Sequence, residues 1–514
     1  MDTFHNPIIS GFYPDPSIVR VEEDYYLVNS SFEYFPAIPI WHSKDLVHWK
    51  QIGHAIDRKT QGLNLSRVNP SGGVQAATIR YHQGMFYISS TRVNPEWPQN
   101  NYHFIVTAKN PRGPWSKCHF IEGAPGIDSA LFFDGDKAYF LANQQKEVYD
   151  RGSETNIWIQ EIDINNMKLI GDRHVLWDGT GGVFAEGPRM FKKDGFYYLL
   201  IAEGGTLHHH ATTVASSHHV FGPFTASRRN PILTHRHLSR TYPIQNVGHT
   251  DLVQTQHGDW YAVCLGSRPK GGFYDGGNTK YSFGGYYRNL GRETFLIPVI
   301  WPQDNEGPLL SAETGKVEML YPFPKLTPVI VEDVHIDFSD KSLQLKWNSA
   351  FKDDIDHVKK CSNASVEMTL QKSLKESFFG TRQTDWHIHQ IISLHVENLI
   401  DNDWIGYVSY INPTTYFGVK CYLQDNLMAS FVSVQDGLEK VHDTFKINKT
   451  IQITLVAQEQ AYTYLVDTPS GKKTLTFDGR HISCDLNDAH TGVFQAFIGQ
   501  SESKTKVIIE FKAK

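Results

Sequence analysis

The sequence predicts an all-β protein built as a five-bladed β-propeller followed by a β-sandwich. Two observations predict this fold: five similar hairpin stretches recur in the first part of the chain, and a different pattern of alternating strands fills the rest. The composition agrees, because 13% aromatic residues and 40 glycines favour short strands and tight turns over long helices. With 514 residues the chain exceeds what one hydrophobic core organises, so we expect two domains.

The five hairpin stretches each contain an apolar strand, a polar turn and an aromatic-rich strand. They read SIVRVEEDYYLV, ATIRYHQGMFYIS, ALFFDGDKAYFLA, RMFKKDGFYYLLI and LVQTQHGDWYAVC. Their equivalent aromatic residues are Tyr25, Phe86, Tyr139, Tyr197 and Trp260, which lie 53 to 63 residues apart. That interval suits a four-stranded blade, so five repeats predict five blades. A β-sandwich made of unrelated hairpins is the alternative for this part of the chain.

One polar residue precedes each hairpin. In GFYPDPSIVR, Asp15 lies between two prolines that restrict its backbone, although taken alone it would also suit an ordinary turn before a strand. Counting back ten or eleven residues from the five aromatics gives Asp15, Gln75, Asp128, Glu186 and His249. If the hairpins are equivalent, these positions begin the innermost strands and converge at the propeller axis. Because buried carboxylates without partners are costly, this convergence indicates a functional site.

Three carboxylates in one pocket suit the hydrolysis of glycosidic bonds. A protonated carboxyl group can donate to the leaving oxygen, while an ionised one activates water or attacks directly. A third carboxylate nearby raises the pKa of the acid by like-charge repulsion. A divalent-metal site is the alternative, since Asp, Glu and His are all metal ligands. We favour sugar hydrolysis.

Two further stretches have more than one interpretation. The run His208–His210 looks like a metal cluster, but consecutive side chains point in different directions, so we expect exposed loop histidines, one of which could line the pocket. In SFEYFP, the aromatic ring of Phe32 either packs in the core or stacks on a sugar ring.

In combination, several motifs resemble family 43 glycoside hydrolases of the β-xylosidase type with a C-terminal β-sandwich. They are GFYPDPSIVR, SFEYFPAIPIWHSKDLVHWKQIGHAI, GIDSALF, AEGPRMFKKDGFYYLLIAEGGT, GHTDLVQTQHGDWYAV and LGRETFL. The resemblance covers essentially the whole chain and implies a five-bladed propeller that hydrolyses with inversion.

The resemblance also implies roles for individual residues. Asp15 would be the general base, Glu186 the general acid, and Asp128 would orient Glu186 and keep its pKa high. Arg292 would contact the sugar and one carboxylate, and Phe32 and His210 would line the first sugar subsite. His249 would lie at the axis, where some relatives bind Ca²⁺.

This chain departs from the family at Gln75, which we also assign to substrate binding. Gln75-Ala76-Ala77 stands where many β-xylosidases of this type carry Trp-Ala-Pro. The difference removes apolar stacking surface from the pocket, so the choice between xylose and arabinose stays open.

The repeat pattern stops before residue 326, and the domains are expected at 1–325 for the propeller and 335–514 for a concanavalin-like β-sandwich. Residues 326–334, within the proline-spaced stretch YPFPKLTPVIVED, are expected to form the linker. On its own the second domain could bind carbohydrate, but in the resembling enzymes it closes one side of the pocket. We expect the segment FQAFIGQSES, residues 494–503, to reach the site.

Charge and targeting signals limit the other functions. The net charge of −6 argues against nucleic-acid or anionic-membrane surfaces, and the odd count of 5 cysteines argues against a disulfide framework. MDTFHNPIIS has no signal-peptide pattern, so a cytoplasmic location is expected. A homo-oligomer stays open, and no cofactor is expected for the chemistry, with a structural Ca²⁺ at the axis as an option.

These observations together predict an exo-acting, inverting β-1,4-xylosidase that releases D-xylose from the non-reducing ends of xylo-oligosaccharides. An α-L-arabinofuranosidase on the same fold, or an enzyme with both activities, is the first alternative. A carbohydrate-binding protein without activity is the second, although all three acidic positions are filled.

Overall fold

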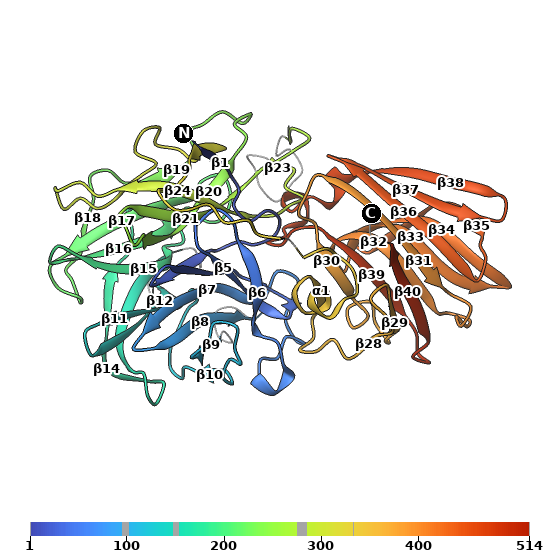
Figure 1. Ribbon diagram of the computed structural model, residues 1–514, viewed down its shortest axis with the longest axis horizontal. Helices are drawn as coiled ribbons and strands as arrows, with labels where there is room; N and C mark the ends of the chain where they lie inside the picture. Colours follow the sequence, from blue (N-terminus) through green and yellow to red (C-terminus); the bar gives the residue numbers. More distant parts are fainter. Residues whose placement is uncertain (1, 95–101, 147–153, 275–284, 333, 513–514) are drawn as a thin grey trace.

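The computed structural model describes residues 2–94, 102–146, 154–274, 285–332 and 334–512. Figure 1 shows two bodies side by side, the first in blue to yellow and the second in orange to red. Within the described ranges only one α-helix occurs, the short α1 (Asp340–Leu345), so the prediction of an all-β protein is confirmed. No helix in these ranges is long and apolar enough to cross a membrane.

The first body contains five antiparallel sheets. In each sheet four strands lie side by side in the order in which they follow along the chain, and one sheet has a fifth strand. The first two consist of β2 (Ser17–Val21), β3 (Asp24–Val28), β5 (Ala37–Ser43) and β6 (Lys50–Ile56), and of β7 (Gly73–His82), β8 (Met85–Val93), β9 (Tyr102–Ala108) and β10 (His119–Phe120). The third consists of β11 (Ala130–Asp134), β12 (Lys137–Gln145), β13 (Thr155–Asp163) and β14 (Lys168–Trp177). The fourth consists of β15 (Glu186–Lys193), β16 (Phe196–Glu203), β17 (Ala211–Ser217) and β18 (Thr225–Ala226), with β19 (Leu233–Thr234) also on β17, and the fifth of β20 (Gln245–Gln254), β21 (Trp260–Ser267), β24 (Glu293–Ile300) and β25 (Leu309–Leu310).

The first strands of these sheets form a closed ring. Strand β2 contacts β7, β7 contacts β11, β11 contacts β15, β15 contacts β20, and β20 contacts β2 again. Strand β1 (Thr3–His5) pairs with β26 (Leu320–Pro322), which joins the two ends of the propeller segment. The five-bladed β-propeller is therefore confirmed, with the first strand of each blade innermost.

The second body consists of two antiparallel sheets that enclose a shared hydrophobic core. In spatial order one sheet contains β35 (Leu438–Lys446), β34 (Asn426–Gln435), β33 (Thr415–Gln424), β32 (Trp404–Asn412), β39 (Phe494–Gln500), β30 (Phe379–Arg382), β27 (Trp347–Ala350) and β4 (Tyr34–Phe35). The other contains β28 (Val358–Lys360), β29 (Ser365–Thr369), β40 (Lys506–Lys512), β31 (His387–His395), β36 (Thr450–Gln458), β37 (Ala461–Thr468) and β38 (Gly471–Asp478).

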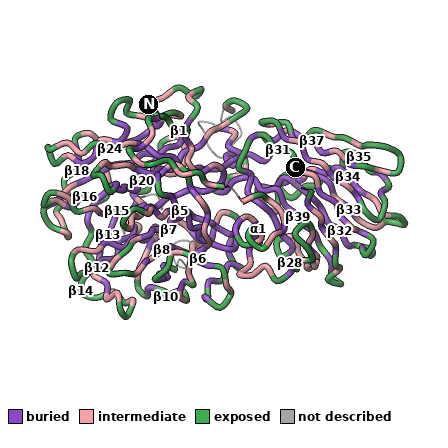
Figure 2. Tube along the Cα trace, in the orientation of Figure 1, coloured by how far each residue is buried: buried purple, intermediate pink, exposed green. Residues whose placement is uncertain are grey.

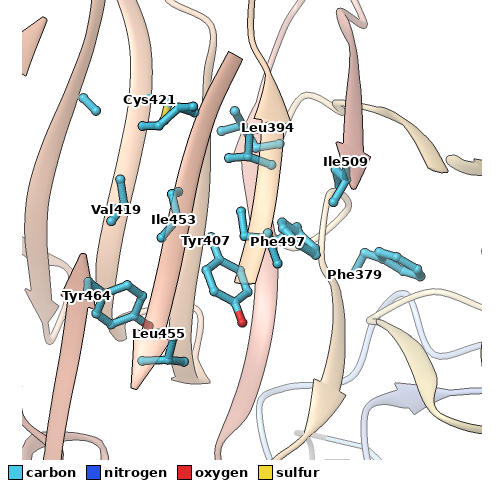
Figure 3. Close-up of a cluster of buried hydrophobic side chains, with 14 of the residues drawn as sticks. Phe379, Leu394, Tyr407, Val419, Cys421, Ile453, Leu455, Tyr464, Phe497 and Ile509 are labelled. Atoms are coloured by element: carbon cyan, nitrogen blue, oxygen red, sulfur yellow. The ribbon is translucent and has the colours of Figure 1, made fainter. Parts of the chain in front are cut away.

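Figure 3 shows the core of this sandwich, where Tyr407, Val419 and Phe497 of one sheet face Ile453 and Tyr464 of the other. All of these side chains are buried, and each large apolar side chain stabilises the fold by about 1.5–3 kcal/mol. Figure 2 shows the same distribution in both bodies, with buried strands inside and exposed turns at the outer edge.

The two bodies share a β-sheet, because β4 belongs to the propeller segment and pairs with β27 of the sandwich. Tyr34 of β4 is fully buried and stacks on Phe494, with ring centroids 4.0 Å apart and an interplanar angle of 18°. Arg382 lies beside these rings, and its Nε donates to the Phe12 carbonyl at 3.1 Å. The exact domain boundary at residues 326–334 stays a prediction.

A second contact between the bodies lies beside the fifth blade. The Arg288 guanidinium forms a buried ion pair with Asp485, and the backbone N–H of Tyr286 donates to the same carboxylate at 2.7 Å. Asn289 donates to the Gly479 carbonyl at 2.8 Å. The segment that leads into Arg292 is thus held by the sandwich.

Replacement of Tyr34 by alanine tests the shared sheet. Tyr34→Ala removes a fully buried ring from the junction, so we expect a loss of about 3–5 kcal/mol in the free energy of unfolding, measured by chemical denaturation. Tyr102→Ala, which removes a tyrosine that is 44% exposed, should cost less than about 1 kcal/mol. Equal losses in the two variants would show that the junction adds no stability.

Candidate active site

A pocket of about 360 Å³ opens at the entrance to the innermost strands. Its walls include Asp15, Phe32, Gln75, Asp128, Glu186, His249, Arg292 and, from the sandwich, His490. The three carboxylates that the sequence singled out therefore lie in one pocket, as do three of the four residues assigned to substrate binding. Asp15 and Asp128 are each only 5% exposed.

One residue per blade takes a left-handed backbone conformation, either just before the innermost strand or within its first half. These residues are Asp15, Ala76, Asp128, Gly187 and His249, with φ between 47° and 61°. In the second, fourth and fifth blades the residue lies within a shift in strand register. A left-handed residue other than glycine costs about 1–2 kcal/mol, so this repeated turn is maintained against strain.

The repeated turn corrects the alignment inferred from the sequence. Asp15, Asp128 and His249 are equivalent, but Gln75 and Glu186 stand one residue before the equivalent position, which Ala76 and Gly187 occupy. Glu186 therefore enters the pocket from a different backbone position than Asp15 and Asp128. Sequence counting missed the offset because the distance to the aromatic residue varies between ten and eleven.

Asp15 is held as an anion. Its Oδ1 accepts a hydrogen bond from Arg292 Nη1 at 3.1 Å, and its Oδ2 accepts one from Ser30 Oγ at 2.6 Å. Burial by itself would raise the pKa of Asp15, but the Arg292 charge, the nearby His249 and the Ser30 hydrogen bond together outweigh it and lower the pKa below its usual value. Ser30 Oγ also accepts from the Ala76 N–H at 2.7 Å, which orients the hydroxyl toward Asp15.

The other two carboxyl groups are shifted in the opposite direction. Burial raises the pKa of Glu186 well above its usual value, and the negative charges of Asp128 and Asp15 raise it further. Burial also raises the pKa of Asp128, with Asp15 adding to the effect. The pocket thus separates one ionised carboxylate from two carboxyl groups that hold protons more tightly, which is the pattern required for acid and base catalysis by carboxyl groups.

The residues assigned to substrate binding divide into two groups. Phe32 is a buried wall, with the Arg292 guanidinium 5.6 Å from the centre of its ring, and Gln75 Nε2 donates to the Ser71 carbonyl at 3.0 Å. His210 is not among the described residues that line the pocket. Its ring packs on Gly248, and its Nδ1 donates to the Asn246 carbonyl at 3.0 Å, so it supports the strand that carries His249.

The histidine run has the mixed exposure expected for a loop. His208 is half-buried, His209 is exposed and His210 is buried, so the expectation of exposed histidines holds for His209 alone. The ring centroids of His208 and His209 lie 5.3 Å apart.

The proposed calcium site at His249 has no support in the surrounding donors. His249 Nε2 accepts a hydrogen bond from the Arg189 guanidinium at 3.1 Å, and a divalent cation on this nitrogen would meet that positive charge. Arg189 in turn lies 3.7 Å from Asp251, which also pairs with Arg80, so an ion-pair network fills the axis beside the pocket. Among the described residues no group of three His, Cys, Asp or Glu side chains is arranged to hold a metal ion.

The sandwich reaches the pocket through a residue that sequence reasoning missed. His490 stacks on Phe32, with centroids 6.3 Å apart, and its carbonyl accepts from Arg292 Nη2 at 3.3 Å. The expectation that residues 494–503 reach the site is wrong, because none of them lines the pocket, and Phe494–Gln500 form β39 inside the sandwich sheet. No repeat or motif pointed to His490, since its place depends on how the two bodies dock.

A propeller whose axial pocket holds carboxyl groups with oppositely shifted pKa values has the arrangement that glycosidic bond hydrolysis requires. The chain belongs to glycosyl hydrolases family 43, whose family model matches residues 4–306. It is therefore a glycoside hydrolase, and it hydrolyses with inversion as enzymes of this family do.

Similar proteins carry two kinds of name. A xylosidase/arabinosidase of Butyrivibrio fibrisolvens is 40% identical over 424 residues, which cover 79% of this chain and 78% of that protein. A non-reducing end α-L-arabinofuranosidase of Bacteroides ovatus is 32% identical, with 96% and 90% of the two chains covered. The solved structure of a xylan β-1,4-xylosidase from Bacillus halodurans matches with a TM-score of 0.89 at 26% identity, covering 99% of this chain and 100% of that one.

The Ser30 hydroxyl provides a test of how Asp15 is kept ionised. Ser30→Ala removes a hydrogen bond to the charged form, so the pKa of Asp15 should rise. If ionised Asp15 is the base, activity is lost as the pH falls through its pKa, and the acid limb of the kcat/KM profile should move to higher pH. Ser409→Ala removes a buried hydroxyl of the sandwich core and should leave the profile in place. An unmoved acid limb in Ser30→Ala would contradict the assignment.

Proposed function

We propose that this glycoside hydrolase is an exo-acting β-1,4-xylosidase that releases D-xylose from the non-reducing ends of short xylo-oligosaccharides. The observation that carries the proposal is the division of charge in the pocket: Arg292 pairs with Asp15 alone, while Asp128 and Glu186 have raised pKa values. In this proposal Asp15 is the general base that activates water, and Glu186 is the general acid that protonates the leaving oxygen. The pKa of Asp128 is raised to about 7, and once Asp128 is ionised its negative charge helps to keep the proton on Glu186.

The size and closure of the pocket support cleavage at a chain end. Its volume of about 360 Å³ lies at the small end of the range for ligand pockets, about 300–1,000 Å³. Ion pairs fill the axis beside it, and His490 of the sandwich forms part of its wall. A pocket closed in this way suits the terminal sugar of a chain better than a sugar in its interior.

An α-L-arabinofuranosidase is the second candidate. Gln75 and Ala76 line the pocket where an indole would give a flat apolar wall, which leaves room for a furanose ring. The relative that covers 96% of this chain is named an arabinofuranosidase. The same pair of carboxyl groups would serve either sugar.

The rates on two aryl glycosides decide between the candidates. We expect kcat/KM on an aryl β-D-xyloside to exceed that on the aryl α-L-arabinofuranoside with the same leaving group by about tenfold or more, since one matched hydrogen bond or wall contact is worth about 1–2 kcal/mol. A ratio below one would replace the xylosidase by the arabinofuranosidase. A ratio near one would mean that the pocket accepts both sugars.

The roles of the two carboxyl groups can be separated by leaving-group dependence. Glu186→Ala should lose about 10²–10⁴-fold in kcat/KM on xylobiose, whose basic leaving group needs a proton, and much less on an aryl xyloside with an acidic phenol. Asp15→Ala should lose a large and similar factor on both substrates, because water must be activated whichever group leaves. A uniform loss in Glu186→Ala, or leaving-group dependence in Asp15→Ala, would reverse or remove these assignments.

A further inference from the structure

Phe184 is an exposed aromatic ring at the rim of the pocket. Its side chain lines the pocket and is 39% exposed, whereas Phe32, the other phenylalanine of the wall, is 2% exposed. Among the described residues that line the pocket, no other Phe, Tyr or Trp ring is exposed. Single exposed apolar side chains are common on protein surfaces, but this one lies on the pocket wall, where its ring is available to an apolar face of a ligand.

The backbone holds this ring in place from both sides. The Val183 carbonyl accepts from the Gly204 N–H at 2.8 Å, and the Ala185 carbonyl accepts from Thr155 Oγ1 at 2.8 Å. Phe184 itself has a left-handed φ of 54°, a conformation that bulky residues adopt only when their surroundings impose it. The ring packs on Gly205, where an added Cβ would lie 3.3 Å from it.

A buried carboxylate organises the loop that precedes the ring. Glu203 is 3% exposed, and its Oε1 accepts from the N–H groups of Thr180 and Gly182 at 2.9 and 3.2 Å. Its Oε2 accepts from Thr213 Oγ1 at 2.5 Å and from Thr180 Oγ1 at 3.1 Å. Glu203 does not line the pocket, so a buried charge with four donors here serves to fix the loop that presents Phe184.

The position of Phe184 relative to Glu186 indicates which part of the substrate it meets. The two residues are separated by Ala185 alone, and both line the pocket. The group that protonates the leaving oxygen must face the leaving sugar, so the rim beside Glu186 is where that sugar lies. Pyranose rings present a face of C–H groups that packs on aromatic rings.

We propose that Phe184 is the stacking platform for the leaving sugar, in the subsite next to the cleaved bond on the reducing side. This inference rests on the proposed role of Glu186 as the general acid. It assigns the missing apolar surface at Gln75 and the apolar surface at Phe184 to different sugars. Gln75 faces the sugar at the non-reducing end, and Phe184 faces the leaving sugar on the reducing side of the cleaved bond.

The test compares a substrate that fills this subsite with one that does not. Xylobiose has a leaving sugar, whereas β-D-xylopyranosyl fluoride releases only fluoride. Phe184→Ala should lower kcat/KM on xylobiose about tenfold, mainly through KM, and change it less than about twofold on the fluoride. Phe184→Trp should stay within about twofold of wild type on both substrates, because it keeps a stacking surface.

Phe221 provides a matched control, because it is also 39% exposed but contacts Tyr139 and His174 away from the pocket. Phe221→Ala should leave both rates unchanged. Equal losses on both substrates in Phe184→Ala, or no loss on xylobiose, would overturn the inference. If the wild type instead prefers α-L-arabinofuranosides, the proposed function fails, and the same comparison with arabinobiose and arabinofuranosyl fluoride decides the role of Phe184.

Discussion

The buried ion pair between Asp15 and Arg292 joins parts of the chain that are far apart in sequence. The two residues are separated by 277 positions and come from the entrance to the first blade and from the fifth blade. Arg292 also donates to the carbonyl of His490 in the sandwich. Removing one partner of a buried ion pair typically costs about 3–5 kcal/mol, because the other charge is left without compensation. The first blade, the last blade and the sandwich must therefore all be in place for this pocket to exist.

The same ion pair accounts for the chemistry of the pocket. One arginine cannot neutralise three buried carboxylates, so the group that it contacts keeps its charge and the others hold protons more strongly. A pocket that satisfied every carboxylate would be more stable, but it would contain no acid. Burial raises the pKa of Glu186, and the uncompensated negative charges of Asp128 and Asp15 raise it further. The repeated left-handed turns add backbone strain at the same place.

Much of the propeller could be predicted because each blade repeats an aromatic residue at a similar position, from Tyr25 to Trp260, and a repeat needs no knowledge of packing. The carboxylates followed from the same repeat. The repeat could not show local shifts in register. Gly187, and not Glu186, occupies the position equivalent to Asp15, and counting residues cannot resolve a shift of one. The surroundings of His249 were also hidden, because Arg189 reaches it from the neighbouring fourth blade.

The contribution of the sandwich was predictable in kind but not in detail. Alternating strands after residue 335 indicated a second β domain, and resemblance indicated that it approaches the pocket. The segment 494–503 appeared suitable but forms β39, while His490 lies in the preceding loop, where nothing in the local sequence marks it. Contacts between domains depend on complementary surfaces, and these surfaces leave no recognisable pattern in the sequence.

The sheet shared through β4 and β27 has a consequence for how the enzyme is made. On the ribosome the first blade emerges long before β27, its partner strand in the sandwich. The Ser71 hydroxyl accepts a hydrogen bond from the backbone N–H of His490, which is synthesised 419 residues later. Before the sandwich is synthesised, Tyr34 lacks the ring of Phe494 that covers it, so a propeller without its sandwich exposes this aromatic side chain. Because the chain is synthesised from its N-terminus, the pocket is complete only after the sandwich has been translated and His490 has docked beside Ser71.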